Sequence, residues 1–443
     1  MIKSKLMAVF AAAFTGVSFA PAYALDLSLN DAVVKINQES HDLKKANANL
    51  KKAEASLDAA NASRWFTLEG TASYMNMVNV ERPLDSKNFE LPPEFGGLLS
   101  EALEGQSVSF EIPDNIFMAG LSFTQPIYTF GKIGNAVKSV KSAIKMAEAS
   151  HELTKREVTY AATDLYWTAK MTDEIVLLAE QDLKNARAAK SKLTSAGRAN
   201  RSNLLKIESD IATKEINVSD AKFNRDTAHR MLKIMAGIDI DEDLVLTDSF
   251  PSTFDALNAP KLTQTPQWEI LDEQVNMYER LARSKRAGAY PTLAATASYN
   301  YMSMSGDIGH MFDKSGSQSA TWGVALQVPI FSGGVNRANA TIEAMNAAAA
   351  REDLAQAKKI TTEQYNNAIK QYNHLRGNLS TLKNARDLAA KTYVLSQNRF
   401  ASGQTSAVEL ADVSAGLYQL DLALLNTKYK ILMSAESVKK LGE

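Results

Sequence analysis

The chain contains no cysteine, which excludes disulfides, thiolate nucleophiles and cysteine-ligated metals. Glycine and proline are sparse, at 21 and 11 of 443 residues, and a composition with so few helix breakers favours long helices. The formal net charge of −1 gives no indication of a nucleic-acid partner. No stretch reaches the roughly 18 uninterrupted apolar residues that indicate a transmembrane helix.

Signatures of catalysis are also missing. The five histidines are scattered and share no metal-ligand or triad spacing. The sequence has no glycine-rich phosphate loop and no G-x-S-x-G nucleophile motif. We therefore expect no enzyme activity, no cofactor, and no catalytic, cofactor-binding or metal-binding residues.

The first 24 residues are typical of a secretory signal peptide. Lys3 and Lys5 form a basic start, the segment 6–19 is mostly apolar, and Ala22-Tyr23-Ala24 is a small-x-small cleavage site. We expect the mature chain to begin at Leu25. A secreted chain of this kind is periplasmic, extracellular, or an outer-membrane barrel, whose spanning strands show only as alternation of apolar and polar residues.

Such alternation predicts four strands, at about 64–77, 116–128, 291–302 and 321–331. Each is long enough to cross a bilayer as a tilted strand, which takes roughly 9–11 residues. The acidic, proline-containing segment 78–115 fits a long outer loop of a barrel. A disordered linker explains its composition equally well.

Helical periodicity fills most of the remaining chain. A first helix is expected over 26–62. No proline occurs from Gly131 to Gly197 or from Gly334 to Gly403, and each stretch makes on the order of 100 Å of helix at 1.5 Å per residue. The turns at Gly197 and Gly403 each lead into a second helix, and a shorter helix is expected over 266–286.

The two halves of the chain repeat one order of elements. The segments 67–77 and 292–302 share seven of eleven residues. Self-similarity at a fixed spacing indicates tandem repeats. We predict a first repeat over 25–237, an irregular connector over 238–265 and a second repeat over 266–443.

A strand-to-helix junction also occurs twice. Pro126-Ile-Tyr-Thr-Phe-Gly131 returns 203 residues later as Pro329-Ile-Phe-Ser-Gly-Gly334. We expect Pro126 and Pro329 to end strands, where a backbone donor is no longer needed. Gly131 and Gly334 would then let the backbone bend into the long helices.

Four strands cannot close a membrane barrel, because eight is about the minimum and lipid does not tolerate an open sheet edge. The chain must therefore oligomerise to give eight, twelve or sixteen strands. The alternative, a helical periplasmic adaptor or a structural coiled-coil protein without a barrel, does not explain alternating strands at equivalent places in both halves.

This pattern resembles the TolC-type outer-membrane efflux and secretion proteins over essentially the whole mature chain. The resemblance rests on the duplicated layout, the two junctions, and the turn glycines Gly197 and Gly403. It implies an α+β membrane protein in a homotrimer, with twelve strands in one β-barrel in outer-membrane lipid and the helices in a long α-barrel across the periplasm. It also implies docking onto a periplasmic adaptor (membrane fusion) protein and an inner-membrane ABC transporter or proton-driven pump. The chain would then be the exit duct of a tripartite efflux or type I secretion system.

The resemblance places the functional site at the periplasmic mouth, where the helix turns converge. Acidic residues after the second turn glycine form a selectivity ring in the family, and Glu409 and Asp412 occupy those positions here. Three residues apart on a helix, they share a face, and a trimer would carry six such carboxylates around one axis. Charged rings of this kind select cations. A solvated helix face is the alternative explanation.

The first turn is opposite in charge, with Arg198, Arg201 and Lys206 after Gly197 and no acidic residue among them. In the family, a tyrosine, an arginine and an aspartate latch the closed mouth. The matching residues here cannot form those bonds; they are Phe400, Thr405 and Asn203. We hypothesise that Arg198 or Arg201 pairs with Glu409 or Asp412 instead.

Overall fold

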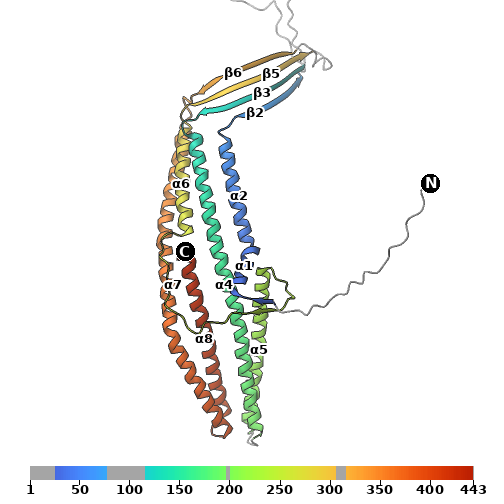
Figure 1. Cartoon of the computed structure of the whole chain (residues 1–443), viewed down its shortest axis with the longest axis vertical. Helices are drawn as coiled ribbons and strands as arrows, with labels where there is room; N and C mark the ends of the chain where they lie inside the picture. The colour runs from blue at the N-terminus through green and yellow to red at the C-terminus, as the bar shows by residue number, and fades with distance from the viewer. Residues whose placement is uncertain (1–24, 77–114, 196–199, 306–315, 443) are drawn as a thin grey trace, which may run out of the picture. The chain divides into compact units, whose positions relative to one another are not determined.

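The computed structural model describes residues 25–76, 115–195, 200–305 and 316–442 (Figure 1). The predicted signal peptide, 1–24, lies outside these residues, as does all but the last residue of the acidic segment 78–115. Contacts within the chain divide it into two compact units. A helical unit comprises Met1–Leu50, Ala147–Ile270 and Asp353–Glu443, and a strand unit comprises Lys51–Met146 and Leu271–Glu352.

The strand unit contains one antiparallel sheet with the order β2-β3-β5-β6. The four strands confirm the four that alternation predicts, with ends that differ by a few residues. They are β2 (Thr67–Asn76), β3 (Asn115–Tyr128), β5 (Thr292–Ser305) and β6 (Ser317–Gln327).

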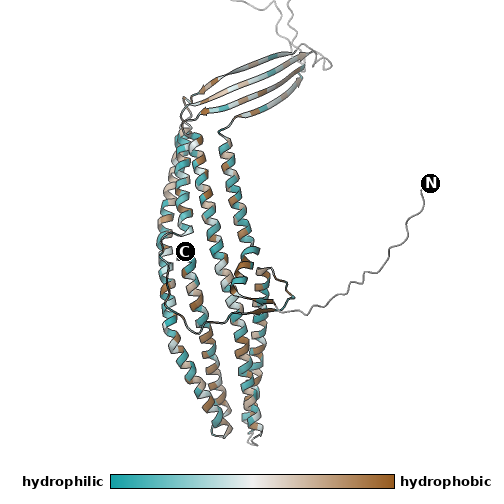
Figure 2. Cartoon of the chain, viewed as in Figure 1, coloured by the Kyte–Doolittle hydropathy of each residue, from teal (hydrophilic) through white to brown (hydrophobic). Residues whose placement is uncertain are grey.

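Alternation gives this sheet two unlike faces, and polar and apolar residues interchange along each strand in Figure 2. One face is apolar: Leu68 lies opposite Phe123, and Ala297 lies opposite Trp322. Trp322 is 90% exposed in the single chain. The other face carries mainly hydroxyl and amide side chains. The apolar face therefore requires an apolar environment outside the chain.

The two strand-to-helix junctions differ from the prediction and from each other. Pro126 does not end a strand, because β3 continues to Tyr128, with a register shift against β5 between these two residues. The fourth strand stops at Gln327, before Pro329 and not at 331. Gln327 pairs with the first residue of β5, so that no neighbouring strand remains for the residues beyond it.

The glycines of the junctions do bend the chain as expected. Gly131 has φ of 87° and Gly334 has φ of 80°, in the left-handed region that favours glycine. The long helices α4 (Lys132–Ser195) and α7 (Val335–Ala401) begin directly after them. Each is on the order of 100 Å long. No helix among the described residues is long and apolar enough to span a membrane.

The predicted helix over 26–62 is wrong as a single element. The chain starts with β1 (Leu25–Leu27), followed by α1 (Leu29–Glu39) and α2 (His41–Ala62). The break falls at Ser40, whose Oγ accepts a hydrogen bond from the Leu43 amide at 3.3 Å. A serine that satisfies backbone donors in this way competes with helical hydrogen bonding.

The remaining helices agree with their predicted places. They are α5 (Arg201–Ala236), α6 (Pro266–Ala287) and α8 (Ala407–Gly442). Of these, α5 and α8 complete the two hairpins of the helical unit. In each half, one long helix therefore pairs with a second helix of 36 residues. The division into two repeats remains a prediction.

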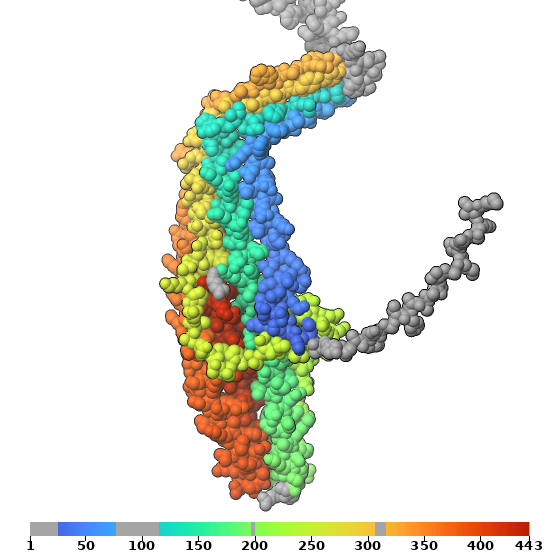
Figure 3. Space-filling model, viewed as in Figure 1, coloured from blue at the N-terminus to red at the C-terminus, as the bar shows by residue number. Residues whose placement is uncertain are grey.

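The sequence predicts the connector 238–265 to be irregular throughout, but it contains a short strand and makes long-range contacts. It contains β4 (Leu244–Leu246), which pairs in parallel with β1. It then follows α7, as the band across the helices in Figure 3 shows. Its carbonyls accept hydrogen bonds from side chains of α7: Tyr372 donates to Asp255 at 2.8 Å, and Arg376 donates to Phe254 at 2.8 Å.

Candidate entrance at the helix turns

The turn between α7 and α8 is short and closed by its own hydrogen bonds. Gly403 has φ of 77°, and its amide donates to the Phe400 carbonyl at 3.0 Å. The Gln404 amide donates to the Arg399 carbonyl at 2.8 Å, which completes a Schellman motif. Ser406 then caps α8, accepting from the Glu409 amide at 3.1 Å. The second predicted turn glycine is therefore confirmed, in a fixed geometry.

Glu409 and Asp412 lie together on the exposed side of the first turns of α8. Ala407, two residues before Glu409, and Leu410, which lies between the two carboxylates, are buried at 1% and 5% exposure. Both carboxylates are exposed, as the spacing of three residues predicts. Thr405 donates a hydrogen bond to the Glu409 carboxylate at 2.7 Å, which fixes that side chain close to the turn.

The other side of these turns is an apolar core that joins both hairpins. Phe400 is only 4% exposed, so that this latch candidate serves as core. The core also contains residues of α4, α5 and α8, so that all four helices meet close to the turns. Its buried members are Ala189, Leu193, Ile207, Tyr393, Phe400, Ala407 and Leu410.

The turn between α4 and α5 is described only from Asn200, which caps α5 by accepting from the Ser202 amide at 3.1 Å. Gly197 and Arg198 lie outside the described residues. Arg201 and Lys206 are exposed, and Asn203 is half-buried. Among the ion pairs of the described residues, none joins Arg201 to Glu409 or Asp412 within one chain.

A buried polar cluster above this core was missed by the sequence reasoning. The Nζ of Lys214 on α5 lies 2.5 Å from Asp182 on α4, and Ser414 on α8 donates to the same carboxylate at 2.8 Å. The Lys214 side chain is only 6% exposed. Asp182 therefore links three helices. The sequence does contain a signal for this cluster. Lys214 lies on the same helical face as the apolar residues Ile207, Val218 and Ala221 of α5, and a lysine on a buried face requires a partner.

The cluster affects neighbouring titratable groups. Burial raises the pKa of Asp210, a second carboxylate 3.8 Å from Lys214. Burial, followed by the charges of Asp182 and Asp210, raises the pKa of Tyr393 to about 12. The tyrosine therefore stays neutral throughout the physiological range.

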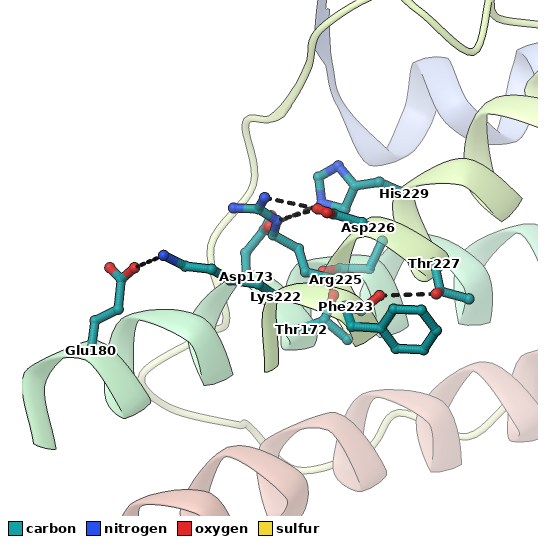
Figure 4. A network of polar contacts seen from close by, with 10 residues as sticks. Thr172, Asp173, Glu180, Lys222, Phe223, Arg225, Asp226, Thr227 and His229 are labelled. Carbon is teal, nitrogen blue, oxygen red and sulfur yellow. Dashed lines mark hydrogen bonds and ion pairs between the residues drawn. The ribbon is translucent and has the colours of Figure 1, made fainter. Parts of the chain in front are cut away.

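Further polar contacts connect α4 and α5 away from the turn (Figure 4). His229 lies 2.9 Å from Asp173, and Lys222 lies 2.7 Å from Glu180. Two more pairs are closer to the turn: Arg187 with Glu215 at 2.7 Å, and Lys190 with Glu208 at 2.8 Å. The first hairpin is thus joined by charge along most of its length.

A family model described as "Outer membrane efflux protein" matches residues 32–237 and 272–441, which is well over half of the chain. The chain belongs to the outer membrane efflux protein family. The gap in the match, 238–271, contains the connector and the start of α6. No curated protein matches the sequence.

Solved outer-membrane channels have the same fold as this efflux protein. The CmeC outer membrane channel of Campylobacter jejuni superposes with a TM-score of 0.77 at 18% identity, covering 94% of this chain and 85% of that chain. VceC, an outer membrane protein of Vibrio cholerae, gives 0.73 at 17%, covering 94% and 96%. CusC, whose structures concern transmembrane channel formation, gives 0.76 at 16%, covering 95% and 93%.

The family and the fold confirm the predicted architecture of the efflux protein. It is an outer-membrane channel protein with a long α-helical barrel and a transmembrane β-barrel, in which each chain of a trimer supplies four strands. Its family consists of channels and not of enzymes. The alternative of an adaptor or coiled-coil protein without a barrel is therefore wrong. In a barrel, the apolar sheet face contacts lipid and the polar face lines the lumen.

Proposed function

We propose that three copies of the chain form the exit duct of a tripartite efflux or type I secretion system. The observation that carries this proposal is the pair of continuous helices α4 and α7, of 64 and 67 residues. Each begins after the junction that follows a strand and is on the order of 100 Å long. Helices of this length suffice to connect an outer-membrane pore to a distant helical entrance.

The entrance is proposed to carry a cation-selective ring. Glu409 and Asp412 are exposed on one face of α8, and Thr405 fixes the first of them beside the turn. Two carboxylates from each of three chains give six around the trimer axis. A ring of negative charge attracts cations and repels anions.

The latch of the closed entrance is proposed to run between chains. Phe400 is buried and the Thr405 hydroxyl already donates to Glu409, so that neither is available to bond across the entrance. Arg201 is exposed at the start of α5 and makes no ion pair with Glu409 or Asp412 of its own chain among the described residues. Arg201, or Arg198 beside it in sequence, then has the charge to bind the carboxylates of a neighbouring chain, with Asn203 and Lys206 on the following turn.

Single-channel conductance tests this latch. We expect Arg201→Ala or Arg198→Ala to raise the conductance of the trimer in a planar bilayer several-fold, because an ion pair that narrows the entrance is lost. Lys222→Ala, which removes an exposed ion pair with Glu180 far from the turn, is the matched control. Wild-type conductance in both arginine variants would rule out the latch.

Chemical crosslinking in living cells tests the duct itself. A photocrosslinking residue at Gln404, in the turn, should capture a periplasmic adaptor protein, and an ABC transporter or a proton-driven pump should co-purify. The same residue at exposed Glu363 on α7 measures background capture. An adaptor-free trimer in export-active cells would contradict a tripartite arrangement. The inner-membrane partner would also indicate whether the cargo is a small molecule or a protein.

A further inference from the structure

The lumen face of the sheet changes character along the strands. Counted from the helix end, the first three rows that span all four strands contain hydroxyl, amide and glycine residues and one glutamate. A row of Pro126, Ala294 and Ala325 precedes them. In strand order the three rows are Thr67, Thr124, Thr296 and Gly323; Glu69, Ser122, Ser298 and Thr321; and Thr71, Gly120, Asn300 and Ser319. They form the polar lining expected of a water-filled pore.

The next two rows, at the hairpin end, are rich in methionine. Met118 lies directly opposite Met302, and Met304 and Met75 both lie opposite Ile116. Four of the chain's fifteen methionines therefore occupy two adjacent rows, directly beyond three polar rows of the same face. We call these four residues the methionine patch.

The register brings the four thioethers within reach of one another. Residues directly opposite in a sheet have Cβ atoms about 4.5–5.5 Å apart, and diagonal neighbours are about 7–8 Å apart. Met118 has Met302 opposite it and both Met304 and Met75 on its diagonals. Methionine is unbranched and has three rotatable bonds. Three sulfur atoms can thus converge on one point over Met118.

The patch is not the interior of a core. Its side chains are 52% (Met75), 40% (Met118), 37% (Met302) and 42% (Met304) exposed. They point away from the apolar face, because alternation places Phe117, Tyr301 and Ser303 on that side. Because these side chains are accessible from the lumen, packing alone does not explain why four flexible, polarisable residues lie together.

Thioether sulfur is a neutral and soft ligand, which selects Cu(I) over hard ions such as Mg²⁺ and Ca²⁺. The two rows contain no aspartate or glutamate that would favour a divalent ion. We propose that the methionine patch is a lumen-side binding site for a soft monovalent cation of the Cu(I) and Ag(I) class. Uncharged ligands on an open surface bind such an ion weakly enough to release it, which suits a site within a conducting pore.

Silver titration of the purified trimer tests this proposal. We expect silver nitrate, added in chloride-free buffer and followed by calorimetry, to bind the wild-type trimer, and Met118→Leu with Met302→Leu to weaken that binding at least tenfold. Leucine is close to methionine in volume, so that the fold is retained. The matched control is Met231→Leu with Met235→Leu, two exposed methionines on α5 outside the patch, and it should bind as the wild type does.

X-ray absorption provides a second measurement, which identifies the atoms that ligate the silver. Because the chain has no cysteine, every protein sulfur is a methionine sulfur. In selenomethionine-labelled trimer, bound silver should show two or three selenium neighbours, and this signal should be lost in the patch variant. Neighbours of nitrogen or oxygen only, or silver binding unchanged in the patch variant, would overturn the proposal. Both measurements use the isolated trimer, so that their outcome is independent of the proposed export partners.

Discussion

The two helical hairpins of the chain have the same fold but are held together differently. Four ion pairs and the contact between His229 and Asp173 join α4 to α5 in the described residues. Between α7 and α8, the described residues show one ion pair, Arg386 with Asp421 at 2.6 Å. The second hairpin has the connector instead, hydrogen-bonded along the side of α7.

The two hairpins also differ in charge at their turns. Glu409 and Asp412 on α8 face solvent, whereas Arg201 and Lys206 are the exposed charges at the start of α5. The apolar positions are retained in both hairpins, and both contribute to the core near the turns. The duplicated fold thus keeps its packing while its charges diverge, and the divergence is strongest where we propose the entrance.

The largest expected effect comes from breaking the buried cluster of the first hairpin. Asp182→Ala leaves Lys214 buried without its closest counter-charge, and removing one partner of a buried ion pair costs about 3–5 kcal/mol. The loss of free energy of unfolding can be measured by guanidinium denaturation, followed by the helical signal in circular dichroism. Arg187→Ala, which breaks a pair exposed at 60% and 50%, should cost less than about 1 kcal/mol. Equal midpoints for the two variants would show that the buried cluster does not hold the hairpins together.

A smaller effect is expected at the turn of the second hairpin. Gly403→Ala forces a side chain into the left-handed region at φ of 77°, which costs about 1–2 kcal/mol. Gly377→Ala lies within α7 with open space around its Cβ position, and it should stabilise the helix by about 0.5–1 kcal/mol. The guanidinium midpoint of unfolding should therefore fall in Gly403→Ala and rise in Gly377→Ala. A shift in one direction for both would contradict the turn geometry.

The smallest effect concerns the connector. Tyr372→Phe removes the hydrogen bond to the Asp255 carbonyl and keeps the ring in its buried place, so that a loss of about 0.5–1.5 kcal/mol is expected. Limited proteolysis within 252–262 should become faster if this contact fixes the connector. Thr362→Val on the exposed side of α7, where the hydroxyl bonds only its own helix at 2.7 Å, is the control. Unchanged cleavage in Tyr372→Phe would mean that the connector is held by other contacts.

Most of the fold could be predicted because its signals are local. Alternation of apolar and polar residues marks the four strands. The glycines Gly131, Gly334 and Gly403 mark bends, and each has positive φ in the structure. What could not be predicted depends on distant partners. The strand β1 is three residues long and pairs with β4 more than 200 residues later, and the end of β6 is set by where β5 begins.

The candidate site divides in the same way. The shared face of Glu409 and Asp412 follows from a spacing of three residues and is confirmed as an exposed pair. The burial of Phe400 and the link from Asp182 to Lys214 and Ser414 require the packing of several helices, which no single segment encodes. The ring and the latch remain predictions, because they concern contacts between three chains.

Ion selectivity of the trimer tests the central claim most directly. The reversal potential across a planar bilayer with a KCl gradient should show the wild-type trimer to be cation-selective. Glu409→Gln with Asp412→Asn should lower the potassium-to-chloride permeability ratio several-fold, because these isosteric changes remove six charges from the entrance and keep the turn. Glu363→Gln, at an exposed site on α7, should leave the ratio unchanged. A ratio in the double variant equal to that of the wild type would contradict an acidic entrance at these residues.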